Sequence, residues 1–316
     1  MNFLRAPRNM LAFVILMILA SVPVVSTLMV QPFYMTFFLR IMIYALAALS
    51  LNLILGYGGL VGFGHALYIG IGAYSVGILA SMGVTNGWIH LCAAVIFSLA
   101  VALFTGAISL RVTGIPFIMI TLAFAQMFFF LAISLKQFGG DEGMTIPVPS
   151  NFGLVDLGRK SVFYYAVFFI LLFSLYFIRR LINSRFGMVL RGSKDNDQRM
   201  NALGFPTFRY RLAAYSISAV MCALAGVLLA NLTGFASPDY MAWSLSGELI
   251  VMVVLGGIGT LMGPVVGAMA LMLLEEALSL CTDHRMIVLG PMIVFTAIMA
   301  RRGIVGLFPA SGGERR

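Results

Sequence analysis

The sequence predicts an all-α protein, a polytopic bundle of about ten transmembrane helices that includes broken or half-length ones. Hydrophobic residues make up 61% of the 316 residues and charged residues only 10%. Soluble domains carry about 25% charged residues. The apolar residues also form long uninterrupted runs, and a bilayer core about 30 Å thick needs roughly 20 such residues per helix. We therefore expect one multi-pass transmembrane domain over residues 1–316.

Ten apolar runs are long enough to enter or cross a bilayer. The first is longer than the roughly 7 to 15 apolar residues of a cleaved signal peptide, so we expect it to remain as a helix. The eighth and tenth are short, and are either half-helices or spans whose ends lie a few residues further out. The expected spans are 11–30, 35–55, 60–82, 88–110, 115–135, 162–177, 212–231, 245–257, 261–280 and 286–299.

Basic residues gather on one side of this predicted topology. With the N-terminus inside and ten spans, the outer side holds only five of the 20 Lys and Arg residues, namely Arg40, Lys136, Arg159, Lys160 and Arg285. The positive-inside rule then places both termini in the cytoplasm. The same bias accounts for the net charge of +9 without nucleic-acid binding, which we do not expect.

Residues 52–81 read NLILGYGGLVGFGHALYIGIGAYSVGILAS and are unusually rich in glycine. Each glycine inside a helix costs up to about 1 kcal/mol relative to alanine. Small residues recur every four positions at Gly58, Gly62, Ala66 and Gly70. This spacing predicts a ridge on one helix face that lets another backbone approach closely. The crowding of glycine at 56, 58 and 59 predicts a break at the start of the helix.

A similar pattern returns in the second half, where VLGGIGTLMGPVVGAMA places Gly259, Gly263 and Gly267 four apart after a glycine pair. Paired glycine-interrupted segments in two halves of a transporter point to the translocation path. We therefore expect a weak internal repeat whose small residues pack helices, and we predict that they also border the path. His65 either makes one helix–helix hydrogen bond or lines that path.

Two connections between spans are long. Residues 136–161, predicted outside, are dense in turn-forming residues and are either an ordered cap or docking surface, or a plain surface loop. Residues 179–211, predicted inside, contain a short helix. We expect Asp195 to cap this helix with Gln198 as its capping-box partner, and Gly204 and Pro206 to end it.

A helix of about eight residues does not persist alone in water, so the short helix is expected to rest against something. Met200 and Leu203 lie three apart and offer apolar anchors on one face. The segment is either a docking helix for a cytoplasmic protein or a basic segment on anionic lipid headgroups. Acidic residues at its start favour docking.

The sequence lacks the motifs of enzymatic chemistry. It has no G-x-x-x-x-G-K-[ST] phosphate loop and no H-E-x-x-H, and its three histidines are too scattered to predict a metal site. Glu248, Glu275 and Glu276 fall at predicted span ends toward the outer face, where we expect their side chains to snorkel. We therefore expect no enzyme activity, metal or cofactor in this chain. Membrane lipid is expected to surround it.

Three motifs occur in order along the chain: NLILGYGGLVGFGHALYIGIGAY, RFGMVLRGSKDNDQRMNALGF and VMVVLGGIGTLMGPVVGA. Together they resemble the LivM-type permeases of branched-chain amino acid ABC importers, from about residue 44 to 308. The resemblance implies a heteromeric importer in a bacterial inner membrane. Its other parts would be a LivH-type sister permease, two cytoplasmic ATP-binding subunits that hold ATP and Mg, and an extracytoplasmic solute-binding protein.

The resemblance also implies that the cytoplasmic connection couples the permease to the ATPase. The implied coupling residues are Arg185, Phe186, Gly187, Arg191, Asp195, Asp197, Met200, Leu203 and Gly204. Branched-chain amino acids are the first expected substrates, with urea, amides or aromatic acids as alternatives. A stand-alone secondary transporter or channel with broken helices is a further alternative.

Overall fold

The computed structural model describes residues 14–23, 32–153, 159–281, 290–291 and 303–306, and these residues are mostly helical. Five of the described helices are long and apolar enough to cross a membrane, which confirms an all-α multi-pass membrane protein. The long helices are α2 (Pro32–Asn52), α4 (Gly87–Ser109), α5 (Ile115–Ser134), α6 (Lys160–Ile182) and α9 (Thr207–Thr233). The other apolar helices are Val14–Pro23, α3 (His65–Ser81), α10 (Trp243–Gly256) and α11 (Gly263–Cys281).

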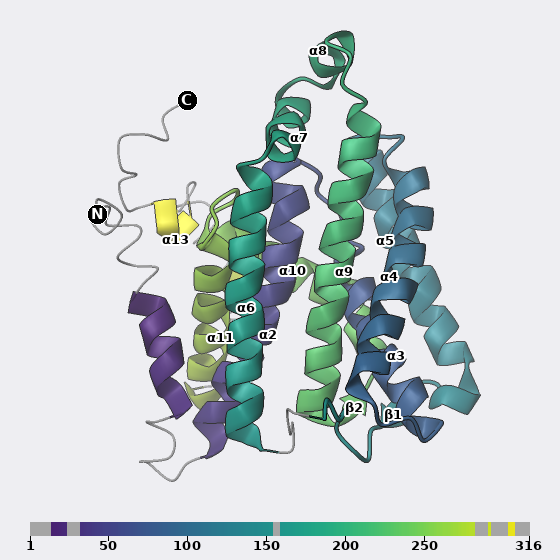
Figure 1. The fold of residues 1–316 in the computed structure, drawn as a ribbon, viewed down its shortest axis with the longest axis vertical. Coiled ribbons are helices and arrows are strands. Elements are labelled where there is room, and N and C mark those ends of the chain that lie inside the picture. Colours follow the sequence, from purple (N-terminus) through teal and green to yellow (C-terminus); the bar gives the residue numbers. More distant parts are fainter. Residues whose placement is uncertain (1–13, 24–31, 154–158, 282–289, 292–302, 307–316) are drawn as a thin grey trace.

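Short elements connect these helices. The connecting helices are α7 (Arg185–Asp195), α8 (Asp197–Ala202) and α13 (Gly303–Gly306), and the short turns are η2 (Leu53–Tyr57), η3 (Lys136–Phe138) and η4 (Pro238–Met241). Strands β1 (Met144–Thr145) and β2 (Phe235–Ala236) pair antiparallel. This β-ribbon and the α7–α8 pair lie at opposite ends of the bundle (Figure 1), as the predicted topology requires of the two long connections.

The first nine predicted spans each overlap a described helix, whereas the tenth lies outside the described residues except at 290–291. Of the two alternatives for the eighth, the structure agrees with a half-helix, because the 14 residues of α10 rise about 21 Å, short of the roughly 30 Å apolar layer. The third starts only at His65, because the chain is not helical between residues 58 and 64.

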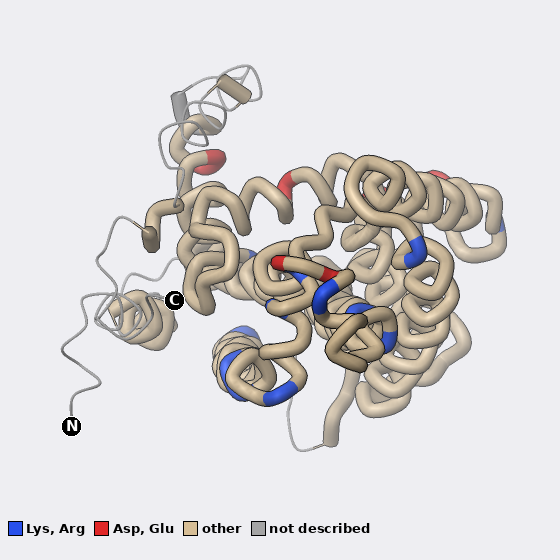
Figure 2. Tube along the Cα trace, turned by 90° about the horizontal axis from the view of Figure 1, so that it is seen from above, with Lys and Arg blue, Asp and Glu red and all other residues tan. Residues whose placement is uncertain are grey.

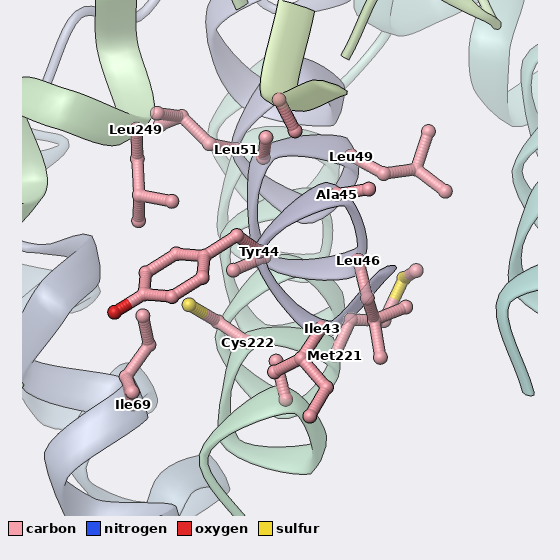
Figure 3. Close-up of a cluster of buried hydrophobic side chains, with 14 of the residues drawn as sticks. Ile43, Tyr44, Ala45, Leu46, Leu49, Leu51, Ile69, Met221, Cys222 and Leu249 are labelled. Atoms are coloured by element: carbon pink, nitrogen blue, oxygen red, sulfur yellow. The ribbon is translucent and has the colours of Figure 1, made fainter. Parts of the chain in front are cut away.

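Helices α2 and α9 form the centre of the bundle. They contact each other, and α3, α6 and α11 pack around them, while much of α4 and α5 stays exposed, as expected of a face turned to lipid. Figure 3 shows the packing around α2, where Tyr44 lies among Ile69 of α3, Cys222 of α9 and Leu249 of α10. Helix packing of this kind replaces the hydrophobic effect as the main source of association in lipid.

Glycines bring α3 and α9 into backbone contact. A Cβ atom at Gly72 would meet the carbonyl oxygen of Ala223, and a Cβ atom at Gly226 would meet the carbonyl oxygen of Ile69. Each helix therefore presents a glycine to the backbone of the other. The predicted role of small residues in helix packing holds for this pair, although these two glycines lie outside the predicted ridge.

The prediction that Gly58, Gly62, Ala66 and Gly70 form a ridge on one helix is wrong in part. Gly58 and Gly62 precede the helix, so only Ala66 and Gly70 lie on α3. The chain is unwound here because Gly59 has a φ of 68°, which a right-handed helix excludes. In the second half, Gly259 likewise lies before α11, with a φ of 73°. Both halves thus have a helix, an unwound glycine-rich segment and a second helix. We name the two unwound segments the first break (58–64) and the second break (257–262).

The two breaks meet through the side chain of Asn52. Its Nδ2 donates to the carbonyl oxygen of Thr260 at 2.9 Å, and its Oδ1 accepts from the backbone N–H of Gly259 at 3.0 Å. A Cβ atom at Gly56 would lie 2.6 Å from the same backbone nitrogen, so only glycine allows this approach. Asn52 is fully buried. One side chain therefore satisfies two backbone groups that the second break leaves without helical partners.

At the other end of the bundle, the described part of the 136–161 connection is ordered. Besides the β-ribbon, the backbone of Asn151 bonds to Gly87 and Thr85 at 2.7 and 2.8 Å. The buried His90 side chain contacts Ser150 Oγ at 2.7 Å. These contacts confirm an ordered cap rather than a plain loop over residues 136–153, and docking of another protein there stays a prediction.

We expect Asn52→Ala to destabilise the bundle, because Gly259 N–H and Thr260 C=O would then be buried without partners. Each unsatisfied group costs about 1 to 3 kcal/mol, so the thermal unfolding midpoint in detergent should fall by several degrees. Asn183→Ala, at an exposed asparagine that ends α6, is the matched control and should leave the midpoint unchanged. Equal midpoints for the two variants would contradict the role given to Asn52.

Candidate functional site

The connection between α6 and α9 holds two short helices. Asn196 separates them, and its Oδ1 accepts from the backbone N–H of Arg199 at 2.9 Å, which makes it the N-cap of α8. The prediction that Asp195 caps this helix with Gln198 is therefore wrong by one residue, because Asp195 is the last residue of α7. Gly204 ends the helix as predicted, with a φ of 87°.

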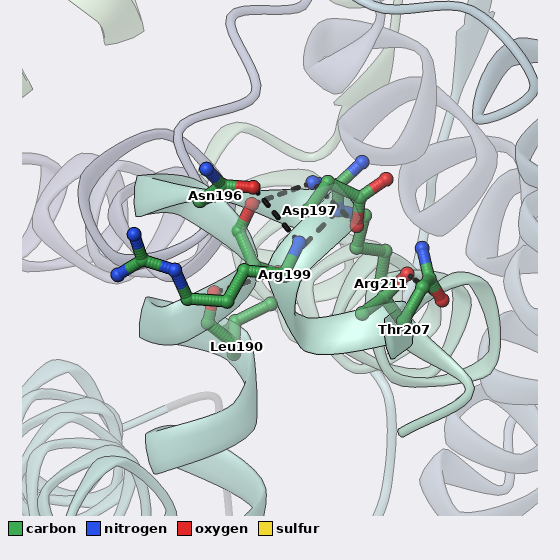
Figure 4. A network of polar contacts seen from close by, with 8 residues as sticks. Leu190, Asn196, Asp197, Arg199, Thr207 and Arg211 are labelled. Carbon is green, nitrogen blue, oxygen red and sulfur yellow. Dashed lines mark hydrogen bonds and ion pairs between the residues drawn. The ribbon is translucent and has the colours of Figure 1, made fainter. Parts of the chain in front are cut away.

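A buried arginine fastens this connection to α9. Arg211, only 7% exposed, donates from Nη2 to the carbonyl oxygen of Ser193 at 2.8 Å and pairs with Asp197 Oδ1 at 3.2 Å. Figure 4 shows Asp197 of α8 and Arg211 of α9 turned toward each other beside Asn196. The Arg211 side chain is buried whereas that of Asp197 is 40% exposed, so removal of the carboxylate would leave the buried guanidinium without its charged partner, which is costly. Helices α7, α8 and the start of α9 are therefore held together.

Lys194 connects the same unit to the first break. Its Nζ donates to the carbonyl oxygen of Gly56 at 2.8 Å. A Cβ atom at Gly59 would lie 2.7 Å from Lys194 Cγ, so the lysine stem also packs directly on the break. A residue of the surface connection thus contacts the unwound backbone between α2 and α3.

Two other side chains accept from backbone N–H groups at the end of the first break. The N–H of Phe63 donates to Thr121 Oγ1 of α5 at 3.2 Å, and the N–H of Ala66 donates to Ser246 Oγ of α10 at 3.0 Å. Unwound backbone is tolerated at membrane depth only where protein groups or water replace the lost helical bonds. Three helices therefore contribute one polar side chain each to the first break or to the residues that flank it, counting Lys194 of α7.

His65 is buried and makes the predicted helix–helix hydrogen bond. Its Nε2 contacts Ser218 Oγ of α9 at 2.9 Å, and Ser218 donates in turn to the carbonyl oxygen of Ser50 at 2.5 Å. Next to it, the hydroxyl of Tyr68 contacts those of Thr105 and Tyr215 at 3.0 Å each. These contacts tie α3 to α2, α4 and α9, and a path-lining role for His65 stays a prediction.

The predicted path residues have distinct surroundings. Gly62 faces Phe117 and Thr121 of α5, and Gly70 faces Met241. Gly263 and Gly267 pack against the α10 backbone, where a Cβ atom at Gly267 would meet the carbonyl oxygen of Met252. Their geometry is that of close packing, and whether any of them borders the path stays a prediction.

A cavity of about 300 Å³ lies where the first break meets α5 and the α7–α8 pair. Of the predicted path residues only Gly58 lines it. The full lining is Gly58, Gly59, Leu60, Val61, Thr113, Gly114, Phe117, Ile118, Ser193, Lys194, Asp197 and Arg211. The cavity is thus polar on the α7–α9 side and apolar on the α5 side.

The predicted coupling residues divide into packed and exposed ones. Phe186 packs on Tyr210 with tilted rings whose centroids are 5.6 Å apart, and Arg191 donates from Nη2 to the carbonyl oxygen of Ile182 at 3.0 Å. Met200 packs on Gly192. Five of them are exposed, namely Arg185, Arg191, Asp195, Leu203 and Gly204. Met200 and Leu203 were expected to share one apolar face, but Met200 is half-buried and Leu203 is 66% exposed.

Sequence reasoning missed Asn52, Lys194 and Arg211 as site residues. Asn52 opens the glycine-rich stretch and is a polar residue inside an apolar run, which is a usable signal. Lys194 and Arg211 were counted only toward the positive-inside bias, since nothing in the pattern distinguishes a buried arginine from a surface one. Figure 2, viewed from the α8 end, shows basic and acidic residues side by side along this connection.

The expectation that Glu248 lies at the outer face is wrong. Ser246, two residues earlier, bonds to Ala66, which lies about 22 Å along α3 from Ser81 at the β-ribbon end. Helix α10 thus begins inside the bundle and carries Glu248 with it. No cluster of metal-ligand residues occurs among the described residues.

Broken helices that meet inside a bundle, with a surface connection tied to one break, are features of a transport protein. Residues 33–297 match the family described as the permease component of branched-chain amino acid transport systems. The chain belongs to this family. The resemblance inferred from the three motifs is therefore confirmed.

Relatives of the chain include permeases named for branched-chain amino acids and one named for autoinducer 2. The chain is 28% identical over 288 residues to the high-affinity branched-chain amino acid permease LivM of Salmonella typhimurium, covering 84% of this chain and 68% of the relative. It is 25% identical to LivH of Escherichia coli, covering 83% and 91%. It is 28% identical to the autoinducer 2 import permease LsrC of an Enterobacter species, covering 89% and 82%. No solved structure matches the chain.

We expect Gly62→Leu to abolish transport by the permease without preventing assembly. A Cβ atom at Gly62 already lies 3.1 Å from the Phe117 ring and 3.3 Å from Thr121 Oγ1, so a leucine must push the first break away from α5. Gly62→Ala is the graded control and should keep most uptake. The measurement is radiolabelled solute uptake beside recovery of the assembled complex. Full uptake by the leucine variant would refute a functional role for this position.

Proposed function

We propose that this chain is the membrane permease subunit of an ATP-driven importer for branched-chain, hydrophobic amino acids, in a bacterial inner membrane with both termini cytoplasmic. Family membership and the relatives named LivM and LivH support this proposal. The chain carries no ATPase motif, so ATP and Mg would bind to two partner subunits. A LivH-type sister permease and an extracytoplasmic binding protein would complete the importer, and no nucleic acid is involved.

The contact between Lys194 Nζ and the Gly56 carbonyl, at 2.8 Å, is the observation that best supports this mechanism. An ATPase that moves α7 and α8 would move Lys194, because Arg211 and Asp197 hold the two helices together. The movement would pass directly to the first break and through Asn52 to the second. Alternating access then follows from a shift of the broken helices, and the permease performs no covalent chemistry.

The ATPase would dock on apolar side chains at the α8 end. Met188 is 57% exposed and Leu203 is 66% exposed, and Phe205 and Phe208 are also exposed beside them. Apolar groups that protrude from a basic connection outside the apolar layer are typical of a protein interface. The bond of Lys194, on the same connection, to the backbone of Gly56 favours docking over simple contact with lipid headgroups.

We predict that Leu203→Asp reduces binding of the ATPase subunit, since it puts a charge into the apolar dock. Met82→Asp, at a residue that is also 66% exposed but lies at the β-ribbon end, is the matched control. Affinity purification of the tagged permease should recover the ATPase with the control and much less of it with Leu203→Asp. Equal recovery would show that the ATPase docks elsewhere.

A separate experiment identifies the substrate, by measuring which solute stimulates ATP hydrolysis. The complex with its binding protein should show ATP hydrolysis stimulated several-fold by leucine, isoleucine or valine. Stimulation by urea, short amides or aromatic acids instead would replace the substrate class and keep the permease function. Uptake by this chain alone, without an ATPase subunit, would refute the importer and favour a stand-alone transporter or channel.

A further inference from the structure

The cavity beside the first break concentrates positive charge. Lys194 and Arg211 line it against one carboxylate, Asp197. Helix α5 begins at Ile115, and the cavity is lined by Thr113 and Gly114 immediately before this start. The first N–H groups of a helix lack helical partners and carry partial positive charge. The cavity therefore combines two cationic side chains with the positive end of a 20-residue helix.

These groups retain hydrogen-bonding capacity. Lys194 has three N–H donors, and the bond to Gly56 uses one of them. The contacts of Arg211 in the described part of the chain use Nε and Nη2, which leaves Nη1 available. Asp197 Oδ1 is buried and lacks a hydrogen-bond partner among the described residues, although it pairs with Arg211. Donors for an anion and an acceptor for a cation thus surround one space.

The opposite wall of the cavity is apolar. Leu60 and Val61 of the first break face the same space as Phe117 and Ile118 of α5. A cavity of about 300 Å³ is at the lower end of the range for small-molecule sites. Three ligand groups would together use every part of this lining. They are a carboxylate near Lys194 and Arg211, an ammonium near Asp197 and an aliphatic side chain on the apolar wall.

We propose that the cavity is a binding site for a hydrophobic amino acid on the α8 side of the permease, separate from the external binding protein. The substrate class rests on the proposed function. Because Lys194 contacts both the cavity and Gly56, a carboxylate bound to its remaining N–H donors attracts the same ammonium group that connects α7 to the first break. Occupancy of the site therefore weakens coupling when the amino acid accumulates on the cytoplasmic side.

Equilibrium binding of radiolabelled L-leucine to the purified complex, without binding protein or nucleotide, tests this site. We expect saturable binding that Lys194→Met weakens about tenfold or more, since a charge-assisted hydrogen bond is lost. Arg199→Met, at an exposed arginine of α8 that does not line the cavity, should bind leucine normally. Val61→Trp, which fills the apolar side and leaves every cation in place, should also remove binding.

Two competitors identify the ligand chemistry. Leucinamide, which keeps the side chain and ammonium but lacks the carboxylate, should not displace leucine. Displacement by inorganic phosphate as strong as by leucine would overturn the amino-acid assignment in favour of a general anion site. Absence of leucine binding in a complex whose ATP hydrolysis leucine still stimulates would overturn the site and leave the proposed function intact. Absence of that stimulation by leucine, isoleucine and valine in the unmodified complex would instead overturn the proposed substrate class on which this site rests.

Discussion

The requirement that buried backbone groups find partners governs this structure. Helices in a bilayer satisfy their own N–H and C=O groups, but a broken helix leaves several of them open in a medium without water. Here two breaks meet at the α8 end of the bundle, and side chains from distant parts of the chain supply the missing partners. Asn52 bonds to the second break, Thr121 bonds to the first, and Lys194 and Ser246 bond to the residues that flank the first.

These partners make the breaks part of one mechanical unit. Each polar side chain that stabilises unwound backbone also fixes the helix from which it comes, so α5, α7 and α10 cannot move without affecting the first break. Glycine contributes at the same places, because the approach of Gly56 to Gly259 leaves no room for a side chain. By contrast, the β-ribbon end is held by backbone pairing and by His90 with Ser150, which suits a fixed cap.

The sequence predicted the class, the approximate places of nine helices and the two long connections, because hydropathy is a local property. It predicted that glycines mark a break, yet it extended the helix back to Gly58 and Gly62, since a four-residue spacing looks the same in a helix and in an unwound segment. The capping prediction failed by one residue because Asp195 and Asn196 are both good N-caps. Contacts such as Asn52 with Thr260 join residues more than two hundred positions apart, and no local pattern contains them.

The coupling of the α7–α8 pair to the breaks is tested most directly by a distance measurement within the complex. Spin labels at Ile258, in the second break, and at Met82, at the β-ribbon end, report how far the break moves between the nucleotide-free and ATP-bound states. Both residues are exposed, and the native cysteines are replaced first. Our account predicts that the distance changes on ATP binding and that Lys194→Met removes most of this change while ATP still binds. An equal change with Lys194→Met would contradict it.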